Sequence, residues 1–556
     1  MNDALPTRTG GRILVDTLLA HGADTGFCVP GESYLEVLDA LWESRNRFRL
    51  ITCRQEGGAA NMAEADGKLT GRPGICLVTR GPGATNASIG VHTAFQDSTP
   101  MLLLVGQVAR DMRGREAFQE VDLEAMFAPL AKWVVEIDDP RRIPELVGRA
   151  WRTATSGRPG PVVISLPEDM LRETCAAPDT EIAPPVQASP AAAAMTALRA
   201  RLAAAARPLM ILGGGAWTAA ARDDIEAFAT ASGIPVAVSF RRQDRFDNHH
   251  PLYAGDVGIG INPALLDRLR ASDLILAVGT RLGEMTTDGY TRLAVPDPEQ
   301  PLVHVHPDPE EIGRVYRPVL GICAGMAEFA AAARALDPVD FAARADQARD
   351  ARADYEIWTG PRPIPGAVQM YDIVRHMQEV LPPDTIVTNG AGNYSVWCNR
   401  FWRYRDFATQ IAPTSGAMGY GVPAAVAAKA RHPARTVVSF AGDGCFLMNG
   451  QELSTAVQHG LDFIVLVVDN GMYGTIRMHQ EGRYPGRVSG TDLRNPDFAA
   501  LARACGAHGE TVRTTAEFAP AFARAREAGG PALLHLLVDP EAITANTTLT
   551  AIREGA

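Results

Sequence analysis

Several features that would point to particular classes of protein are missing from this 556-residue sequence. The longest apolar runs, such as Phe463 to Val468, are far shorter than the roughly 18 residues needed to cross a membrane. The N-terminal segment lacks the basic, apolar and small-residue succession of a secretory signal. There is no basic excess, since the net charge is -11, and phosphate binding needs a basic face. We therefore expect neither a membrane nor nucleic acid as a partner.

Cysteine is sparse and carries no metal-binding pattern. The eight cysteines are scattered singly, with no Cys-x-x-Cys pair. This argues against structural zinc and fits a reducing compartment, so we expect eight free thiols and a cytoplasmic protein. The rest of the composition, 46% apolar and 21% charged, is ordinary for a globular protein.

Alternating strand and helix patterns recur along the whole chain and are interrupted by two boundary segments. Residues 176–194 are rich in proline and alanine, and residues 361–366 read PRPIPG. We predict three doubly wound α/β domains with parallel sheets: residues 1–175, residues 190–340 and residues 365–550. In the second range a glycine triplet follows a strand, which is weak evidence for nucleotide binding because such triplets serve helix packing at least as often. Residues 337–353 are predicted to be helical.

The stretch from Gly442 to Asn470 is the strongest local signal. An apolar strand over residues 436–441 runs into Gly442-Asp443-Gly444, where backbone N–H groups can approach a phosphate closely. After a further 25 residues, a second apolar strand ends at Asn470. Aspartate, asparagine and one carbonyl suit Mg²⁺, which takes its other oxygens from phosphates and water. Gly-Asp-Gly alone is usually only a turn, so the spacing to Asn470 carries the prediction.

This spacing resembles that of thiamine diphosphate (ThDP) enzymes, and two further segments resemble the same enzymes. One is RQEGGAANMAEADGKLTGRPG from Arg54, and the other is AFQE over residues 117–120. The match covers nearly the whole chain and is with the family of acetolactate synthase, pyruvate oxidase and benzoylformate decarboxylase, most strongly with the acetolactate synthase catalytic subunit. The resemblance implies three α/β domains, with ThDP between the first domain of one subunit and the third of its partner. It therefore implies a homodimer or homotetramer.

The resemblance also implies roles for individual residues. Glu56 would hydrogen-bond the pyrimidine ring of ThDP and favour the tautomer that activates it, although an isolated glutamate there would be read as a first-turn helix acid. Met418 would hold ThDP bent, although most methionines are core residues. Phe118 and Gln119 would line the reaction pocket. Asp443, Asn470 and the Met472 carbonyl would bind Mg²⁺. The other implied cofactor-binding residues are Gly31, Asn393, Gly416, Gly442, Gly444, Cys445, Tyr473 and Gly474.

Four segments depart from the acetolactate synthase pattern. Asn393-Tyr394-Ser395 stands where those enzymes usually have Gln-His-Gln, and Gly283-Glu284-Met285 stands where they have the arginine for a second ketoacid. His479 replaces a pocket tryptophan, and the Gly-Asp-Val-Gly of residues 255–258 replaces a Met-His-Gly that contacts FAD. FAD is therefore a doubtful cofactor.

These patterns leave two reactions open. The first is acetolactate synthase-like decarboxylation of a 2-ketoacid with carboligation, in which two pyruvates give acetolactate and CO₂. The alternative is a non-oxidative 2-ketoacid decarboxylase or C–C lyase acting on another substrate. A silent, non-catalytic ThDP-fold protein is disfavoured, because Glu56 and both side-chain metal ligands are present.

Overall fold

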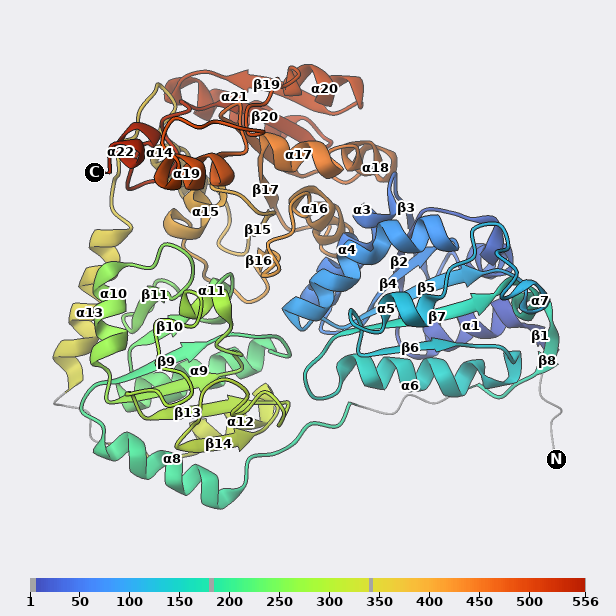
Figure 1. The fold of residues 1–556 in the computed structure, drawn as a ribbon, viewed down its shortest axis with the longest axis horizontal. Helices are drawn as coiled ribbons and strands as arrows, with labels where there is room; N and C mark the ends of the chain where they lie inside the picture. The colour runs from blue at the N-terminus through green and yellow to red at the C-terminus, as the bar shows by residue number, and fades with distance from the viewer. Residues whose placement is uncertain (1–6, 180–184, 340–343, 556) are drawn as a thin grey trace.

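Three six-stranded parallel sheets form the framework of the protein (Figure 1). The computed structural model describes residues 7–179, 185–339 and 344–555. The first sheet has the order β3-β2-β4-β5-β7-β6. Its strands are β2 (Thr25–Cys28), β3 (Arg49–Thr52), β4 (Gly74–Val78), β5 (Met101–Gln107), β6 (Trp133–Glu136) and β7 (Pro161–Pro167). The helices and small strands around it are α1 (Gly10–Ala20), α2 (Leu35–Glu43), α3 (Glu56–Thr70), α4 (Gly81–Asp97), α5 (Leu123–Phe127), α6 (Ile143–Thr155), α7 (Glu168–Arg172), and the antiparallel pair β1 (Thr7–Thr9) and β8 (Thr174–Ala176).

The second sheet has the order β11-β10-β9-β12-β13-β14. Its strands are β9 (Pro208–Leu212), β10 (Val236–Val238), β11 (Tyr253–Asp256), β12 (Leu274–Val278), β13 (Leu302–His306) and β14 (Leu320–Cys323). Its helices are α8 (Ala192–Ala204), α9 (Ala219–Ser232), α10 (Pro263–Ala271), α11 (Glu284–Thr287), α12 (Met326–Arg334) and α13 (Ala345–Trp358). The helix predicted over residues 337–353 therefore starts later and runs further, and residues 340–343 lie outside the described residues.

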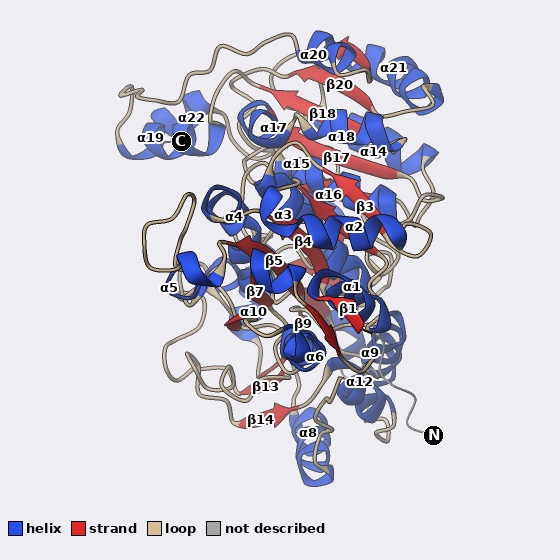
Figure 2. Ribbon diagram, turned by 90° about the vertical axis from the view of Figure 1, so that its right-hand side faces the viewer, coloured by secondary structure: helices blue, strands red, loops and turns tan. Residues whose placement is uncertain are grey.

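The third sheet has the order β16-β15-β17-β18-β20-β19. Its strands are β15 (Ile386–Asn389), β16 (Gln410–Ile411), β17 (Val437–Gly442), β18 (Ile464–Asp469), β19 (His508–Val512) and β20 (Ala532–Leu537). Its helices are α14 (Met370–Val380), α15 (Ser395–Phe401), α16 (Gly421–Arg431), α17 (Asp443–Asn449), α18 (Glu452–His459), α19 (Gly474–Arg483), α20 (Phe498–Ala504), α21 (Thr515–Glu527) and α22 (Leu549–Arg553). Figure 2 shows α19 and α22 side by side, away from the body of this sheet.

The first and third sheets share one topology, the second sheet differs from them in strand order, and the predicted fold class is confirmed. In each, the second strand of the sheet lies on one side of the first strand and a later strand lies on the other side. In all three sheets the chain direction across the sheet therefore reverses beside the first strand, between β2 and β4, between β9 and β12, and between β15 and β17. Ligands of such sheets bind at the carboxyl ends of the strands beside that reversal. The domain boundaries remain a prediction.

The first and third sheets are joined by helices with small side chains. Alanines dominate the buried face of α3 and of α16, and both helices belong to one continuous apolar core that also includes β4 and β17. Small residues let the two helices approach closely, as Figure 1 shows at the centre of the molecule. The first and third domains therefore share one apolar core on the faces that these helices cover, and each has a further core of its own.

A buried group of charged residues lies where the three sheets' domains meet. On α3, Lys68 forms ion pairs with Glu64, at 3.0 Å, and with Asp97 at the end of α4. Tyr420, beside α16, donates to Glu64, and Arg242 of the central domain donates to the Asp97 carbonyl at 3.2 Å. Burial alone would raise the pKa of Asp97, but Lys68 and Arg242 hold that pKa below its ordinary value. The charges are thus compensated across all three domains.

Candidate active site

A pocket of about 230 Å³ lies at the reversal point of the third sheet. Its walls come from the loops that follow β15, β17 and β18, from the start of α19 and from the segment after β20. The carboxyl ends of neighbouring parallel strands meet at one edge, and this brings together residues far apart in the sequence. All predicted cofactor residues except Gly31 and Glu56 line this pocket: Asn393, Gly416, Met418, Gly442, Asp443, Gly444, Cys445, Asn470, Met472, Tyr473 and Gly474.

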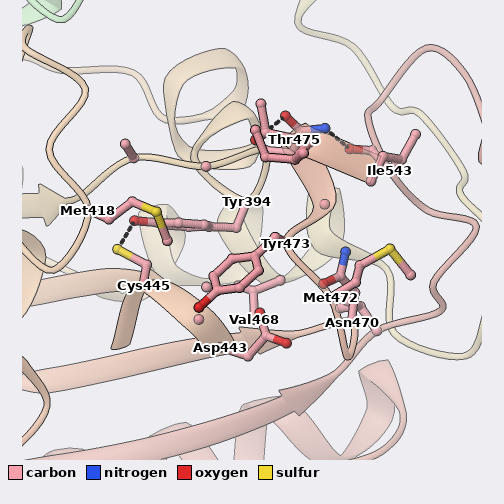
Figure 3. A pocket seen from close by; sticks show the side chains of 18 of the residues that line it. Tyr394, Met418, Asp443, Cys445, Val468, Asn470, Met472, Tyr473, Thr475 and Ile543 are labelled. Atoms are coloured by element: carbon pink, nitrogen blue, oxygen red, sulfur yellow. Dashed lines mark hydrogen bonds between the residues drawn. The ribbon is translucent and has the colours of Figure 1, made fainter. Parts of the chain in front are cut away.

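Figure 3 shows how these side chains are distributed. Met418 and Cys445 lie at one end of the pocket, and Asn470 and Met472 lie at the other. Asp443 lies between the two ends, close to Tyr473. The predicted metal ligands therefore run from one end of the cavity to its middle, and Met418, the residue predicted to bend the cofactor, lies at the other end.

Asp443 is an acid without a cationic partner. Within the described residues it forms no ion pair, and its Oδ2 accepts a hydrogen bond from Asn495 Nδ2 at 2.7 Å. Burial raises the pKa of Asp443 to about 6, and the nearby Asp469 adds to that rise. A bound cation would relieve both effects, since an opposite charge favours the ionised form. The donor set of Asp443 with the Asn470 side chain therefore fits Mg²⁺.

A second carboxylate, that of Asp469, fixes the residue that hydrogen-bonds Asp443. Asn495 Nδ2 also donates to Asp469 Oδ1, at 2.8 Å, and His535 Nε2 lies 2.8 Å from Asp469 Oδ2. Burial alone would raise the pKa of Asp469, but His535, the Gly471 N–H and Asn495 lower it below its ordinary value. Asp469 thus remains ionised and fixes the Asn495 amide against Asp443.

The other end of the pocket is held by sulfur and hydroxyl contacts. The Tyr394 hydroxyl lies 3.1 Å from Cys445 Sγ, which also accepts from the Gly419 N–H at 3.1 Å. Burial raises the pKa of the Cys445 thiol and the pKa of Tyr394. Both groups therefore stay neutral and hold the loop that carries Met418 against the turn after β17.

Asn393, which lines the pocket, has its polar atoms engaged within the protein. Its Oδ1 accepts from Thr475 Oγ1 at 2.8 Å, and its Nδ2 donates to the Ile543 carbonyl at 3.3 Å (Figure 3). These bonds connect the loop after β15 to α19 and to the C-terminal segment. Asn393 therefore joins three parts of the pocket wall.

The remaining predicted residues lie at the carboxyl edge of the first sheet, outside the pocket. Gly31 follows β2 and packs against Thr79, which follows β4. Glu56 begins α3, and its Oε2 accepts from Asn86 Nδ2 at 2.9 Å. The Gln119 carbonyl accepts from the Gly81 N–H at 2.8 Å at the start of α4. Together these residues line the reversal point of the first sheet.

Phe118 projects from that edge without cover. Its side chain is 77% exposed, although a phenyl ring gains free energy on burial. The Phe118 carbonyl accepts from Arg80 Nη1 at 3.2 Å, which ties its backbone to the start of α4. The first-sheet edge is therefore an open surface, in contrast with the enclosed third-sheet pocket.

The reversal point of the second sheet is closed by packing. The backbone of Gly214, at φ +73°, lies so close to Gly279 that a Cβ would come within 1.9 Å of the Gly279 carbonyl oxygen. Trp217 is buried over this turn and donates from Nε1 to the Gly213 carbonyl at 2.7 Å. Arg242 Nε donates to the Gly214 carbonyl at 3.1 Å. The glycine triplet here serves close packing.

The positions that depart from the acetolactate synthase pattern are spread over the molecule. Met285 lies on the short α11, half-buried, and His479 is exposed on α19. Arg292 donates to the carbonyls of Val257 and Gly258, at 2.7 and 3.1 Å, and so fixes the segment after β11. Of these positions, Asn393 and Tyr394 line the third-sheet pocket, whereas Met285, His479 and the segment after β11 do not.

Sequence reasoning missed several residues of the pocket and its support. Val538, Ala542 and Ile543 follow β20, and their position after a strand of the same parallel sheet was a usable signal. Asn495 carried no signal, because it lies in a loop before α20 without any strand to direct it. The eight cysteines are free, as predicted.

Three parallel sheets with a largely apolar pocket at a reversal point, into which a few polar groups face, define an α/β enzyme of the cofactor-binding kind. Three family models identify it further: the N-terminal binding domain of thiamine pyrophosphate enzymes matches residues 8–126, the central domain residues 195–333, and the C-terminal binding domain residues 390–536. Thiamine pyrophosphate is another name for ThDP.

Curated relatives extend the match over nearly the full chain. The acetolactate synthase large subunit of Corynebacterium glutamicum is 31% identical, over 97% of this chain and 88% of its own length. That of Parasynechococcus marenigrum is 34% identical over 92% and 84%. The acetolactate synthase isozyme 2 large subunit of Escherichia coli is 30% identical over 95% of both chains. The chain therefore belongs to the thiamine pyrophosphate enzyme family, with the acetolactate synthase large subunits as relatives, and it is a ThDP-dependent enzyme.

Proposed function

We propose that this enzyme decarboxylates a 2-ketoacid and joins the remaining fragment to a second carbonyl compound, as acetolactate synthases do with two pyruvates. The observation that carries the proposal is the third-sheet pocket, in which a turn for a diphosphate and an Asp–Asn pair for its metal face one cavity. Relatives named acetolactate synthase large subunit, matched over more than nine-tenths of this chain, support the reaction type.

Mg²⁺ and the diphosphate of ThDP are proposed to bind at the turn after β17. Asp443, the Asn470 side chain and the Met472 carbonyl would hold the metal, and the raised pKa of Asp443 favours a cation there. Gly442, Gly444 and Cys445 would offer the diphosphate backbone N–H groups at the start of α17. Gly416, Tyr473 and Gly474 would line the rest of the cofactor, and Met418 would support its bend. When bound, ThDP supplies the electron sink for loss of CO₂.

Glu56 is proposed to complete the site from another subunit. Its carboxylate would share a proton with the pyrimidine ring, and Gly31 would lie beside that ring. Phe118 and Gln119 would contact the substrate. The open first-sheet edge, with its exposed Phe118, supports a homodimer or homotetramer in which this edge faces the partner's pocket. In this proposal the three predicted domains are the structural units, and the first domain of one subunit would face the third domain of its partner.

A second reaction is favoured by the departures near the pocket. Asn393 is tied to Thr475 and Ile543, and the half-buried Met285 stands in the segment where acetolactate synthases carry an arginine for a second ketoacid. A site without that arginine would hold a second carboxylate weakly. A non-oxidative 2-ketoacid decarboxylase or C–C lyase is therefore the alternative.

FAD is proposed to be dispensable. The glycine turn after β9 is filled by Trp217 and by contact with Gly279, and its carbonyls accept from Trp217 and Arg242. A nucleotide would need this space. The purified protein should therefore lack flavin absorbance, and a yellow protein with bound flavin would reject this part of the proposal.

The cellular setting is proposed from composition. Eight free thiols fit a cytoplasmic enzyme. Within the described residues, no helix has both the length and the apolar character required to cross a bilayer. The acidic net charge continues to favour small-molecule substrates over nucleic acid.

One assay separates the two reactions. The protein, loaded with ThDP and Mg²⁺, is given a panel of 2-ketoacids with and without aldehyde or ketoacid acceptors, and CO₂ and carbon products are measured together. Acetolactate and CO₂ from pyruvate support the first proposal. Free aldehyde as the sole product supports the alternative, and no CO₂ from any ketoacid rejects both.

A further inference from the structure

We propose that Glu452, on α18 of the third domain, is a positioning residue for Glu56 of the same chain. This rests on the proposed role of Glu56 in activating ThDP. Glu452 contacts no part of the pocket, yet its carboxylate reaches the two residues that precede Glu56. It would set the position of the activating carboxylate without touching the cofactor.

The contacts of Glu452 all converge on the entry to α3. Its Oε1 accepts from the backbone N–H groups of Arg54 and Gln55, each at 3.1 Å. Its Oε2 accepts from the Arg54 N–H at 3.3 Å and from Thr455 Oγ1 at 2.5 Å. Every partner is a donor, and an ionised carboxylate is the group that only accepts. The side chain is fully buried, at 0% exposure.

Because the Glu452 carboxylate is buried, it depends on these hydrogen bonds to compensate its charge. Within the described residues no basic side chain forms an ion pair with Glu452, so the backbone N–H groups at the start of α3 provide its stabilisation together with Thr455. The positive end of the α3 dipole adds to this. Burial raises the pKa of Glu452, as expected for an acid without a cation. Loss of the carboxylate would leave the partly buried Arg54 and Gln55 N–H groups without this acceptor.

The surrounding residues reinforce the same junction. The Thr52 N–H donates to His459 Nε2 at 3.2 Å, and Arg54 Nη2 donates to Gln458 Oε1 at 2.6 Å. Gly58, in the first turn of α3, leaves room for the carboxylate, because a Cβ there would lie 2.7 Å from Glu452 Oε1. Helix α18 thus fixes residues 52–55, and Glu56 follows with its Oε2 held by Asn86.

Two substitutions separate positioning from charge. Glu452→Ala removes both oxygens, whereas Glu452→Gln keeps one oxygen that can accept from both N–H groups and places an amide beside Thr455. We expect Glu452→Ala to lower kcat by roughly tenfold to a hundredfold, the scale of a small misplacement of a reacting group. Glu452→Gln should recover most of that loss. The control is Glu311→Ala, which removes another buried carboxylate, one that pairs with Arg158 and Arg314 instead of with the entry to α3, and it should leave kcat unchanged.

A readout without cofactor tests the contact itself. In the apo protein, hydrogen–deuterium exchange of the peptide containing residues 52–58 should accelerate in Glu452→Ala and stay near wild type in Glu311→Ala. Unchanged exchange in Glu452→Ala would overturn the inference. Because this readout needs neither ThDP nor turnover, it does not depend on the proposed role of Glu56.

A double-mutant cycle with Glu56→Gln decides whether Glu452 acts through Glu56. If it does, Glu452→Ala should reduce turnover in the wild-type background and have little further effect beside Glu56→Gln. An equal fold-loss in both backgrounds would mean general damage to the fold and would overturn the inference. Full turnover of Glu56→Gln alone would instead reject the proposed function, while the exchange result would stand.

Discussion

The carboxyl edges of the first and third sheets have the same topology and opposite surroundings. The third-sheet edge is an enclosed pocket of about 230 Å³, walled by loops, by α19 and by the segment after β20. The first-sheet edge carries Glu56, Gln119 and an uncovered Phe118. The strand order alone therefore does not make a closed site, because the segments that follow the strands decide whether the edge is covered. One edge is therefore enclosed by its own chain, whereas the other is open in this chain.

The largest effect is expected from removing the anionic oxygen of the enclosed edge. Asp443→Ala should weaken Mg²⁺-dependent ThDP binding by more than about 100-fold and abolish turnover. Mutating a residue that only orients a metal ligand already lowers metal affinity by about 10- to 100-fold, and loss of a ligand itself should lower it at least as much. Titration calorimetry with ThDP and Mg²⁺ measures this. Asp462→Ala, at a carboxylate that is 59% exposed and paired with Lys429, is the control. Wild-type affinity in Asp443→Ala would contradict our view of the pocket.

At the open edge of the first sheet, loss of the Glu56 carboxylate should abolish most turnover while ThDP still binds. Glu56→Gln should lower turnover by about 10²- to 10⁴-fold, the usual contribution of a general acid–base group, with ThDP affinity within about tenfold of wild type. The control is Glu124→Gln, which changes another first-turn helix acid, on α5, that lies outside the site. Equal behaviour of the two variants would mean that Glu56 is only a helix acid.

A smaller effect is expected at the uncovered ring of the open edge. Phe118→Ala should raise KM for the 2-ketoacid by roughly tenfold, because an apolar contact with the substrate is lost and its binding free energy with it. The Tm should change little, because the ring is exposed. Ile357→Ala on α13 is matched to it, because that side chain is 72% exposed and lies on another domain. Steady-state kinetics and sedimentation of both variants give the comparison. Identical KM values for the two variants would remove Phe118 from the reaction pocket.

The smallest effect concerns the cover of the enclosed edge. Glu481 on α19 accepts from Arg553 of α22 and from the Gly486 N–H, and these bonds lower the pKa of Glu481 to about 2 from its ordinary 4.5. Glu481→Gln should cost about 1–3 kcal/mol of stability at neutral pH. Because the folded-state pKa is lowered, this stabilisation exists above pH 4.5 and is lost as the pH falls toward 2.

Melting temperatures of wild type and Glu481→Gln across this pH range test the sign. The difference between them should be largest near neutral pH and shrink as the solution is acidified. Glu379→Gln, at a carboxylate that is 58% exposed on α14 and pairs with Arg375, should change Tm little at any pH. A difference that grows on acidification would contradict the assigned ion pair.

The sequence was most informative where a buried strand ends in a polar residue. The prediction that Asp443 and Asn470 meet followed from two apolar strands of a parallel sheet, and both residues line one pocket. Asn495 and Glu452 could not be found that way. Asn495 lies in a loop, and the Arg54 and Gln55 N–H groups that Glu452 accepts from are nearly 400 positions away in the chain. Long-range contacts of this kind leave no periodic pattern.

The helix boundaries near residues 337–353 show a second limit. Alanine and charged residues run through α12, the segment after it and α13, so composition alone could not locate the break between the helices. Helix propensity is similar throughout such a stretch, and tertiary packing decides where each helix starts.

The buried charges at the meeting point of the three domains have a consequence for unfolding. Lys68, Asp97, Tyr420 and Arg242 come from three domains, and separation of any one domain would strand an unpaired charge in the interior of the others. Separating the first and third domains would also expose the apolar core that α3 and α16 share. The chain should therefore melt as one cooperative unit, with a single calorimetric transition, and an isolated domain should not be stable alone.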